Sequence, residues 1–249
     1  MRLGSLGRWL KSLGWYLSFS EAYLSSILML LVYLYVIDRF KLAWEVALSY
    51  SVADAMLLVF KSSASRVEPV LVSLHAVTLV SILFCYAREE GYDYAGFLIG
   101  LTTSRIYSLK LASYLVLASG PVVLAKTIYA LSRDAGLVLG NLGLFLLVLG
   151  KIWVNLLIFQ LYLFLFYSAL AYAVPRSVYY LLLASVELYA LETPMGGPLQ
   201  VYPLYHKLVV SAGDALTVAL GYPSIFITAV AAGVLAGYAY VVRGEVKWR

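Results

Sequence analysis

The sequence has 249 residues, of which 63% are hydrophobic and only 12% are charged. Soluble domains are close to half apolar and a quarter charged, so this composition excludes a water-soluble globular protein. The net charge is +5, but the basic residues lie at the ends of apolar stretches rather than in one patch, which argues against a nucleic-acid partner.

The apolar stretches are long, continuous and rich in Leu, Ala and Val. They predict membrane-crossing helices, because the strands of a β-barrel would alternate between apolar and polar residues. We therefore expect an all-α, polytopic membrane protein with a single transmembrane domain over residues 21–249. The one cysteine and two distant histidines do not form a disulfide or metal-binding pattern.

Residues 1–20 are predicted to form an amphipathic helix in the plane of the membrane surface. Leucines recur at helical spacing, basic residues lie between them, and Trp9 and Trp15 are suited to the headgroup layer. The alternative is a frayed basic leader that only fixes the orientation of the chain.

Residues 42–60 are apolar on average but contain Glu45 and Asp54. An acid near the centre of a span costs about 2.5–3.5 kcal/mol on insertion scales, so we expect a surface or re-entrant segment there. A polar loop over 61–69 precedes the next span, and Pro121 is available to kink the third. The six predicted spans are 21–37, 70–87, 106–131, 152–174, 177–191 and 216–242.

The region from 132 to 174 is harder to divide into elements. Residues 132–136 are predicted to form a loop, and 137–174 is too long for one span of about 20 residues and too short for two. Because Lys151 interrupts the apolar run, we expect 137–150 to be re-entrant or interfacial and the span to begin after it.

Both ends of the chain are basic, so the positive-inside rule predicts that both termini are cytoplasmic and that the number of spans is even. Six spans satisfy this condition. Eight also satisfy it if 42–60 and 137–150 both cross the membrane. The two alternatives place residues 88–105 on opposite sides, and the six-span alternative makes them cytoplasmic.

A charged elbow joins the second and third predicted spans. The charges Arg88, Glu89, Glu90 and Asp93 follow one another closely after the apolar run. An amphipathic stretch over 94–101 comes next, and the polar residues 102–104 form a helix-start signal. These features predict a short helix at the membrane surface, where a soluble partner could reach it.

The spacing within this elbow is distinctive. An Arg-Glu-Glu-Gly box directly follows a span, a leucine-rich stretch comes next, and an isoleucine and a lysine open the following span. The residues concerned are Arg88, Glu89, Glu90, Gly91, Phe97, Leu98, Ile99, Leu101, Ile106 and Lys110. In this pattern the sequence resembles the membrane subunits of type-2 ABC transporters, the exporter-like permease class.

This resemblance implies a permease that dimerises with itself or a related permease in the plasma membrane and pairs with two cytoplasmic ATP-binding subunits. ATP and Mg²⁺ would be bound by those partners, since this chain has no phosphate-binding loop and is not expected to be an enzyme. The resemblance also implies that the elbow is a coupling helix. Its expected docking residues are Arg88, Glu89, Glu90, Gly91, Phe97, Leu98, Leu101, Arg105 and Lys110.

Simpler explanations remain for several of these residues. Glu89 and Glu90 would also be explained as solvated charges at the end of a span. Lys151 and Glu187 are candidates for a substrate path, but long side chains near span ends also reach the membrane surface by snorkelling. His75, in a span with serine and threonine, is expected to bond to a neighbouring helix.

Two other functions are compatible with the sequence. The chain could be a membrane anchor or scaffold subunit that transports nothing. An intramembrane enzyme would need a set of catalytic polar residues on one face, which the sequence does not show. The identity of a substrate does not follow from these residues.

Overall fold

The computed structural model describes residues 20–39, 67–98 and 100–173, and a few isolated helical residues beyond them. All regular elements in this part of the chain are helices, which confirms the all-α prediction. The predicted surface helix up to residue 19, the segment 42–60 and nearly all of the predicted spans 177–191 and 216–242 lie outside the described residues. The isolated residues are Val178, Tyr180, Leu181, Ser185, Tyr205, Ala231, Gly233 and Val234.

Among the described residues, four helical stretches are long and apolar enough to cross a membrane: Ser20–Ile37, Glu68–Glu89, Thr103–Ser132 and Leu142–Ala171. The protein is therefore a multi-pass helical membrane protein, and these stretches overlap the first four of the six predicted spans. The elements that form them are α2 (Ser20–Arg39), α5 (Val67–Val80) with η1 (Ser81–Tyr86) and α6 (Ala87–Glu89), α8 (Thr103–Gly140) and α9 (Leu142–Ala173).

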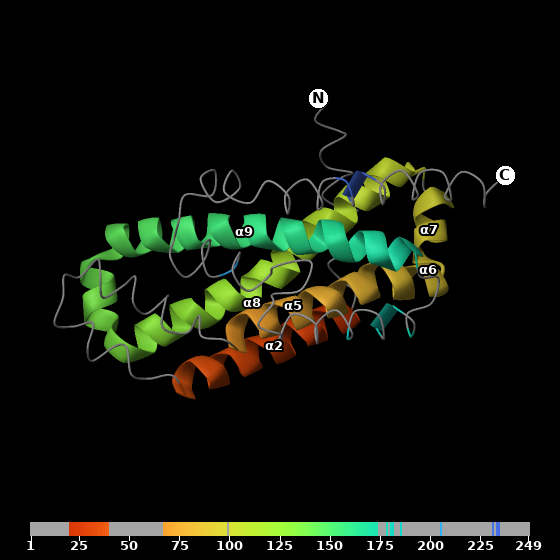
Figure 1. The fold of residues 1–249 in the computed structure, drawn as a ribbon. Coiled ribbons are helices and arrows are strands. Elements are labelled where there is room, and N and C mark those ends of the chain that lie inside the picture. Colours follow the sequence, from red (N-terminus) through yellow and green to blue (C-terminus); the bar gives the residue numbers. More distant parts are fainter. Residues whose placement is uncertain are drawn as a thin grey trace, which may run out of the picture.

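These helices form an elongated bundle (Figure 1). Helix α2 packs mainly against α8, while α5 contacts α2, α8 and α9 and so occupies the middle of the bundle. The outer face of α2 carries exposed Leu24, Leu28 and Leu31. In a membrane this face meets lipid, which is as apolar as leucine and gives no reason to bury it.

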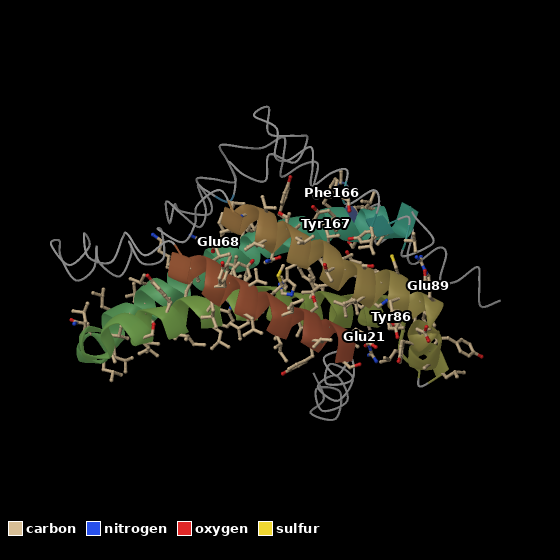
Figure 2. All side chains as sticks on the ribbon, turned by 90° about the horizontal axis from the view of Figure 1, so that it is seen from below. Glu21, Glu68, Tyr86, Glu89, Phe166 and Tyr167 are labelled. Atoms are coloured by element: carbon tan, nitrogen blue, oxygen red, sulfur yellow. The ribbon has the colours of Figure 1, made fainter. Side chains whose placement is uncertain are left out.

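Helices α2 and α5 run in opposite directions. Glu21, Tyr86 and Glu89 lie at one end of the bundle and Glu68 at the other (Figure 2). The Tyr86 hydroxyl donates a hydrogen bond of 3.4 Å to Oε1 of Glu21. In the eight-span alternative a crossing through 42–60 would bring Glu68 to the same end as Glu21. The observed arrangement is therefore not the one that a crossing through 42–60 would give.

The division of residues 132–174 predicted from the sequence is wrong. Residues 132–136 are not a loop, because α8 continues as a helix to Gly140. Residues 137–150 are not a separate segment, and Lys151 does not interrupt the chain, because α9 runs unbroken from Leu142 to Ala173. The two helices are separated only by Asn141, where the ribbon turns back at the green end of α8 (Figure 1).

Helix α8 ends at Asn141, whose backbone departs from the helical conformation. The Asn141 side-chain amide donates to the Leu137 carbonyl at 3.0 Å, and its backbone N–H donates to the same carbonyl at 3.2 Å. The backbone bond is the ordinary helical one, and the side-chain amide adds a second donor to the same carbonyl in the last turn of α8. With 32 residues, α9 is about 48 Å long, whereas the hydrocarbon core is about 30 Å thick. Parts of α8 and α9 therefore extend beyond the core.

Candidate functional site: a braced elbow and a buried ion pair at the opposite end

The elbow contains a short helix, α7 (Tyr92–Leu98), between the second and third spans. Gly91 has a φ of 76° and Gly100 a φ of 82°, a backbone conformation that favours glycine, and these two residues flank α7. After α7, the Leu101 N–H donates to the Gly96 carbonyl at 3.0 Å and the Gly100 N–H to the Phe97 carbonyl at 2.9 Å. These are the bonds of a Schellman motif, so the sequence itself stops α7 there.

Helix α8 begins at Thr103, with Thr102 in an extended conformation before it. This confirms the helix start that residues 102–104 predicted. The elbow is therefore a seven-residue helix held between two tight turns, and its position in the chain agrees with the prediction from the sequence.

A buried ion pair fastens α7 to α8. Nζ of Lys110 lies 2.7 Å from Oδ2 of Asp93, and the side chains are 0% and 12% exposed. The Lys110 ammonium also lies 4.8 Å from the centre of the Phe84 ring, a cation–π contact. The resemblance placed Lys110 among the expected docking and coupling residues, and in the structure its side chain is fully buried between α7 and the bundle.

The elbow is also attached to the other helices. Arg88 Nη2 donates to the carbonyl of Ala171 at 3.4 Å, in the last turn of α9, where carbonyls lack intrahelical donors. Tyr86, just before the elbow, reaches Glu21 in the first turn of α2. The elbow end of the bundle therefore has a polar attachment to both α2 and α9, the other two described spans.

An aromatic cluster lies under these attachments. The ring of Phe84, on the π-helical turn η1, lies 5.9 Å from Tyr107 and 5.6 Å from Phe164, and Tyr107 and Phe164 are 5.6 Å apart between centroids. A π-helical turn is uncommon and is often found at functional sites. Here it places Phe84 beneath Lys110, so that the packing of α5, α8 and α9 supports the ion pair.

The outer side of the elbow is quite different. Glu89 and Glu90 are exposed, and the side chains of Tyr94 and Leu98 are 46% and 69% exposed. Tyr94 and Leu98 are four residues apart and so lie on the same side of α7. Of the apolar residues expected to dock, only Leu98 is exposed, whereas Phe97 and Leu101 pack against the core. Arg105 is exposed beyond the start of α8.

A second buried ion pair lies at the opposite end of the bundle. Nζ of Lys126, on α8, lies 2.9 Å from Oε1 of Glu68, on α5, and both side chains are 2% exposed. The hydroxyl of Tyr205 donates to the same carboxylate oxygen at 2.6 Å. Burial, and then the neighbouring Glu68 carboxylate, raise the pKa of Tyr205 well above its usual range, so its hydroxyl remains a donor.

Polar pairs also connect the helices between these two ends. The Tyr114 hydroxyl donates to Oε1 of Gln160 at 2.6 Å, linking α8 to α9. Nε2 of His75 lies 3.4 Å from Oγ of Ser26, linking α5 to α2. The latter contact confirms the expectation that His75 bonds to a neighbouring helix.

Only one of the two candidate substrate-path residues lies in the described part of the structure. Lys151 lies on α9 and is exposed. Glu187 lies outside the described residues. Their role in a substrate path remains a prediction.

The residues that pair with the two buried lysines carry no local sequence signal of that pairing. Glu68 falls in the predicted polar loop and Asp93 among the charges of the elbow, and Tyr205 carries no signal. A useful signal was present for Lys126, because an ionisable residue inside a span needs a buried partner. That partner is 58 residues away in the chain, so no local pattern could identify it.

Comparison with models of known protein families finds no match for this chain, and comparisons with characterised proteins and with solved structures find none either.

Proposed function

We propose that this chain is the permease subunit of an ABC transporter, which moves a substrate outward across the plasma membrane when separate ATPase subunits close. The observation that supports this proposal is the two-sided construction of the elbow. Its inner side is fastened to the helices of the bundle, and its outer side displays acids beside an apolar pair.

The outer side has the composition of a small docking patch. Glu89 and Glu90 can accept charge-assisted hydrogen bonds, which are stronger than neutral ones. Tyr94 and Leu98 supply an apolar centre of the kind that contributes most to binding when a partner excludes water from it. An ATPase would then contact the glutamates at the rim and the apolar pair in the middle.

The inner side has the attachments that transmission requires. A short helix pushed by a partner moves the membrane part only if it cannot slide over it, and switching proteins commonly use such rigid-body displacements. The Lys110–Asp93 pair and the Arg88 bond to α9 provide this restraint. A passive anchor needs the outer patch but has no use for the bracing.

The remaining parts of the proposal are topological. The chain crosses the membrane six times, both termini and the elbow are cytoplasmic, and two copies, or one copy and a related permease, form the pathway. The antiparallel course of α2 and α5 supports this count over the alternative with eight spans.

The proposal is tested by purifying the tagged chain from its own membranes in a mild detergent and measuring the ATP turnover that accompanies it. We expect Leu98→Ser to reduce the retained turnover by at least tenfold, because it removes the most exposed apolar side chain of the patch. The matched control is Leu139→Ser. Leu139 is 64% exposed, compared with 69% for Leu98, but lies near the far end of α8.

The side of the membrane is tested separately. In a Cys85→Ala background, a single cysteine at Leu98 should react with an impermeant thiol reagent in inside-out vesicles but not in right-side-out vesicles. Reaction from the outer face would overturn the topology and the docking role together. Cytoplasmic reaction without any retained ATP turnover would instead favour the anchor or scaffold function.

A further inference from the structure

The residues Ser119, Gly120 and Pro121, here called the hinge triplet, lie in the middle of α8. Each weakens a helix for a different reason. Pro121 has no N–H to donate to the carbonyl of Leu117, and glycine gives the backbone extra freedom. The Ser119 hydroxyl donates back to the Leu115 carbonyl at 2.6 Å, an arrangement that often bends helices.

The carbonyl released by Pro121 is bonded by another helix. Oγ of Ser26, on α2, lies 3.3 Å from the Leu117 oxygen and is also within 2.9 Å of the Ala22 oxygen. Nε2 of His75, on α5, lies 3.4 Å from the same hydroxyl. As the hydroxyl proton is shared between two carbonyls, the imidazole N–H is placed to donate to the serine oxygen. Helices α2, α5 and α8 thus meet at the hinge triplet.

The triplet divides α8 into two arms that carry different polar attachments. The elbow-side arm is bound to α7 by Lys110–Asp93 and to α9 by the Tyr114–Gln160 bond. The far arm is bound to α5 through Lys126–Glu68, with Tyr205 on the same carboxylate. A bend between the arms would therefore change the position of the far cluster relative to the elbow.

We propose that α8 bends at the hinge triplet and that Ser26, supported by His75, is the catch that limits this bend. From Pro121 to Ser132 the far arm is about 17 Å long, so a change of about 20° displaces its end by about 6 Å. The hinge itself depends only on contacts within this chain. Its use in coupling ATP turnover to transport rests on the proposed function.

The test uses distances between spin labels, measured by pulsed electron paramagnetic resonance in phosphatidylcholine–phosphatidylglycerol nanodiscs. Labels are attached to cysteines introduced at exposed positions of a Cys85→Ala chain, diluted with unlabelled chain so that only intrachain distances are read. The pair Leu28 and Ser132 spans the hinge triplet, and the pair Leu28 and Ser108 lies on its elbow side as an internal reference.

Pro121→Ala restores a backbone donor to the Leu117 carbonyl and should narrow the Leu28–Ser132 distance distribution by several ångströms. Ser26→Ala removes the catch and should broaden it. Neither should alter the Leu28–Ser108 distribution. The matched control is Pro69→Ala, because Pro69 lies in the first turn of α5, where a missing N–H breaks no helical bond.

If Pro121→Ala does not fold, Gly120→Ala takes its place. The position is exposed and nothing lies within 4 Å of the added methyl group, so this variant stiffens α8 without a clash. The hinge would be overturned if the stiffened variant (Pro121→Ala or Gly120→Ala) and Ser26→Ala both kept the wild-type width of the Leu28–Ser132 distance distribution. Equal changes in the Leu28–Ser132 and Leu28–Ser108 distributions would also overturn it. If α8 bends but the purified chain retains no ATP turnover, only the proposed function is refuted. If the chain retains ATP turnover and α8 is rigid, only the hinge is refuted.

Discussion

Removing the carboxylate of Asp93 should strongly destabilise the elbow end of the bundle. The Lys110 ammonium is fully buried and lies 2.7 Å from this carboxylate, so the truncation leaves a charge in an apolar environment. Breaking a buried ion pair by removing one partner costs about 3–5 kcal/mol. The Phe84 ring, 4.8 Å from Nζ, remains in the variant and retains some stabilisation, which puts the expected cost near the lower end, about 3 kcal/mol.

The single cysteine of the sequence provides the assay. Cys85 is fully buried on η1, next to Phe84, and becomes reactive only when this end of the bundle opens. At a fixed pH, the rate of modification by a fluorescent maleimide reports the opening equilibrium. A cost of about 3 kcal/mol should accelerate that rate by about 100-fold in Asp93→Ala. Glu90→Ala, an exposed acid in the same elbow, should change it by no more than about twofold.

The two ends of the ion pair should not be equivalent. Asp93 is 12% exposed and Lys110 is 0% exposed, so Lys110→Met leaves a carboxylate that can still reach water and should be the milder change. The double variant with leucine at both positions removes both charges and should return close to the wild-type rate. A wild-type rate in Asp93→Ala, or a larger effect of Lys110→Met, would refute the view that this pair fastens the elbow.

Three further outcomes follow from the geometry. Gly91 has a φ of 76°, so Gly91→Val should strain the backbone by about 1–3 kcal/mol and lower the retained ATP turnover. Membrane insertion, measured by carbonate extraction, should stay intact, and unchanged turnover would contradict the role of this turn. Tyr205→Phe should lower the thermal unfolding midpoint, since a hydrogen bond to a charged group contributes about 1.5–3 kcal/mol, and an unchanged midpoint would count against the 2.6 Å bond to Glu68. A double-mutant cycle of Tyr114→Phe and Gln160→Leu should give a coupling energy of about 1 kcal/mol, and additive effects would argue against that pair.

Hydropathy along the chain was sufficient to predict a helical membrane protein and the first four spans. An apolar helix must satisfy its backbone bonds internally in lipid, and this requirement can be read from each segment alone. The elbow was also found locally, because Gly91 and residues 102–104 carry their turn and helix-start signals in their own chemistry. The predicted element bounds near residues 132–151 were wrong. A lysine such as Lys151 is compatible with the interior of a helix, and the break between α8 and α9 lies instead at Asn141.

The tertiary structure alone decided which polar groups meet. Glu68 finds Lys126 on another helix and Tyr205 at a separation of 137 residues, and no pattern of local spacing encodes such pairs. The fold also decided that Lys110, which the resemblance placed among the docking and coupling residues, is buried against Asp93, while Leu98 remains exposed. A hydropathy pattern specifies which residues tolerate lipid, but the partner of a buried charge depends on how the helices pack around it.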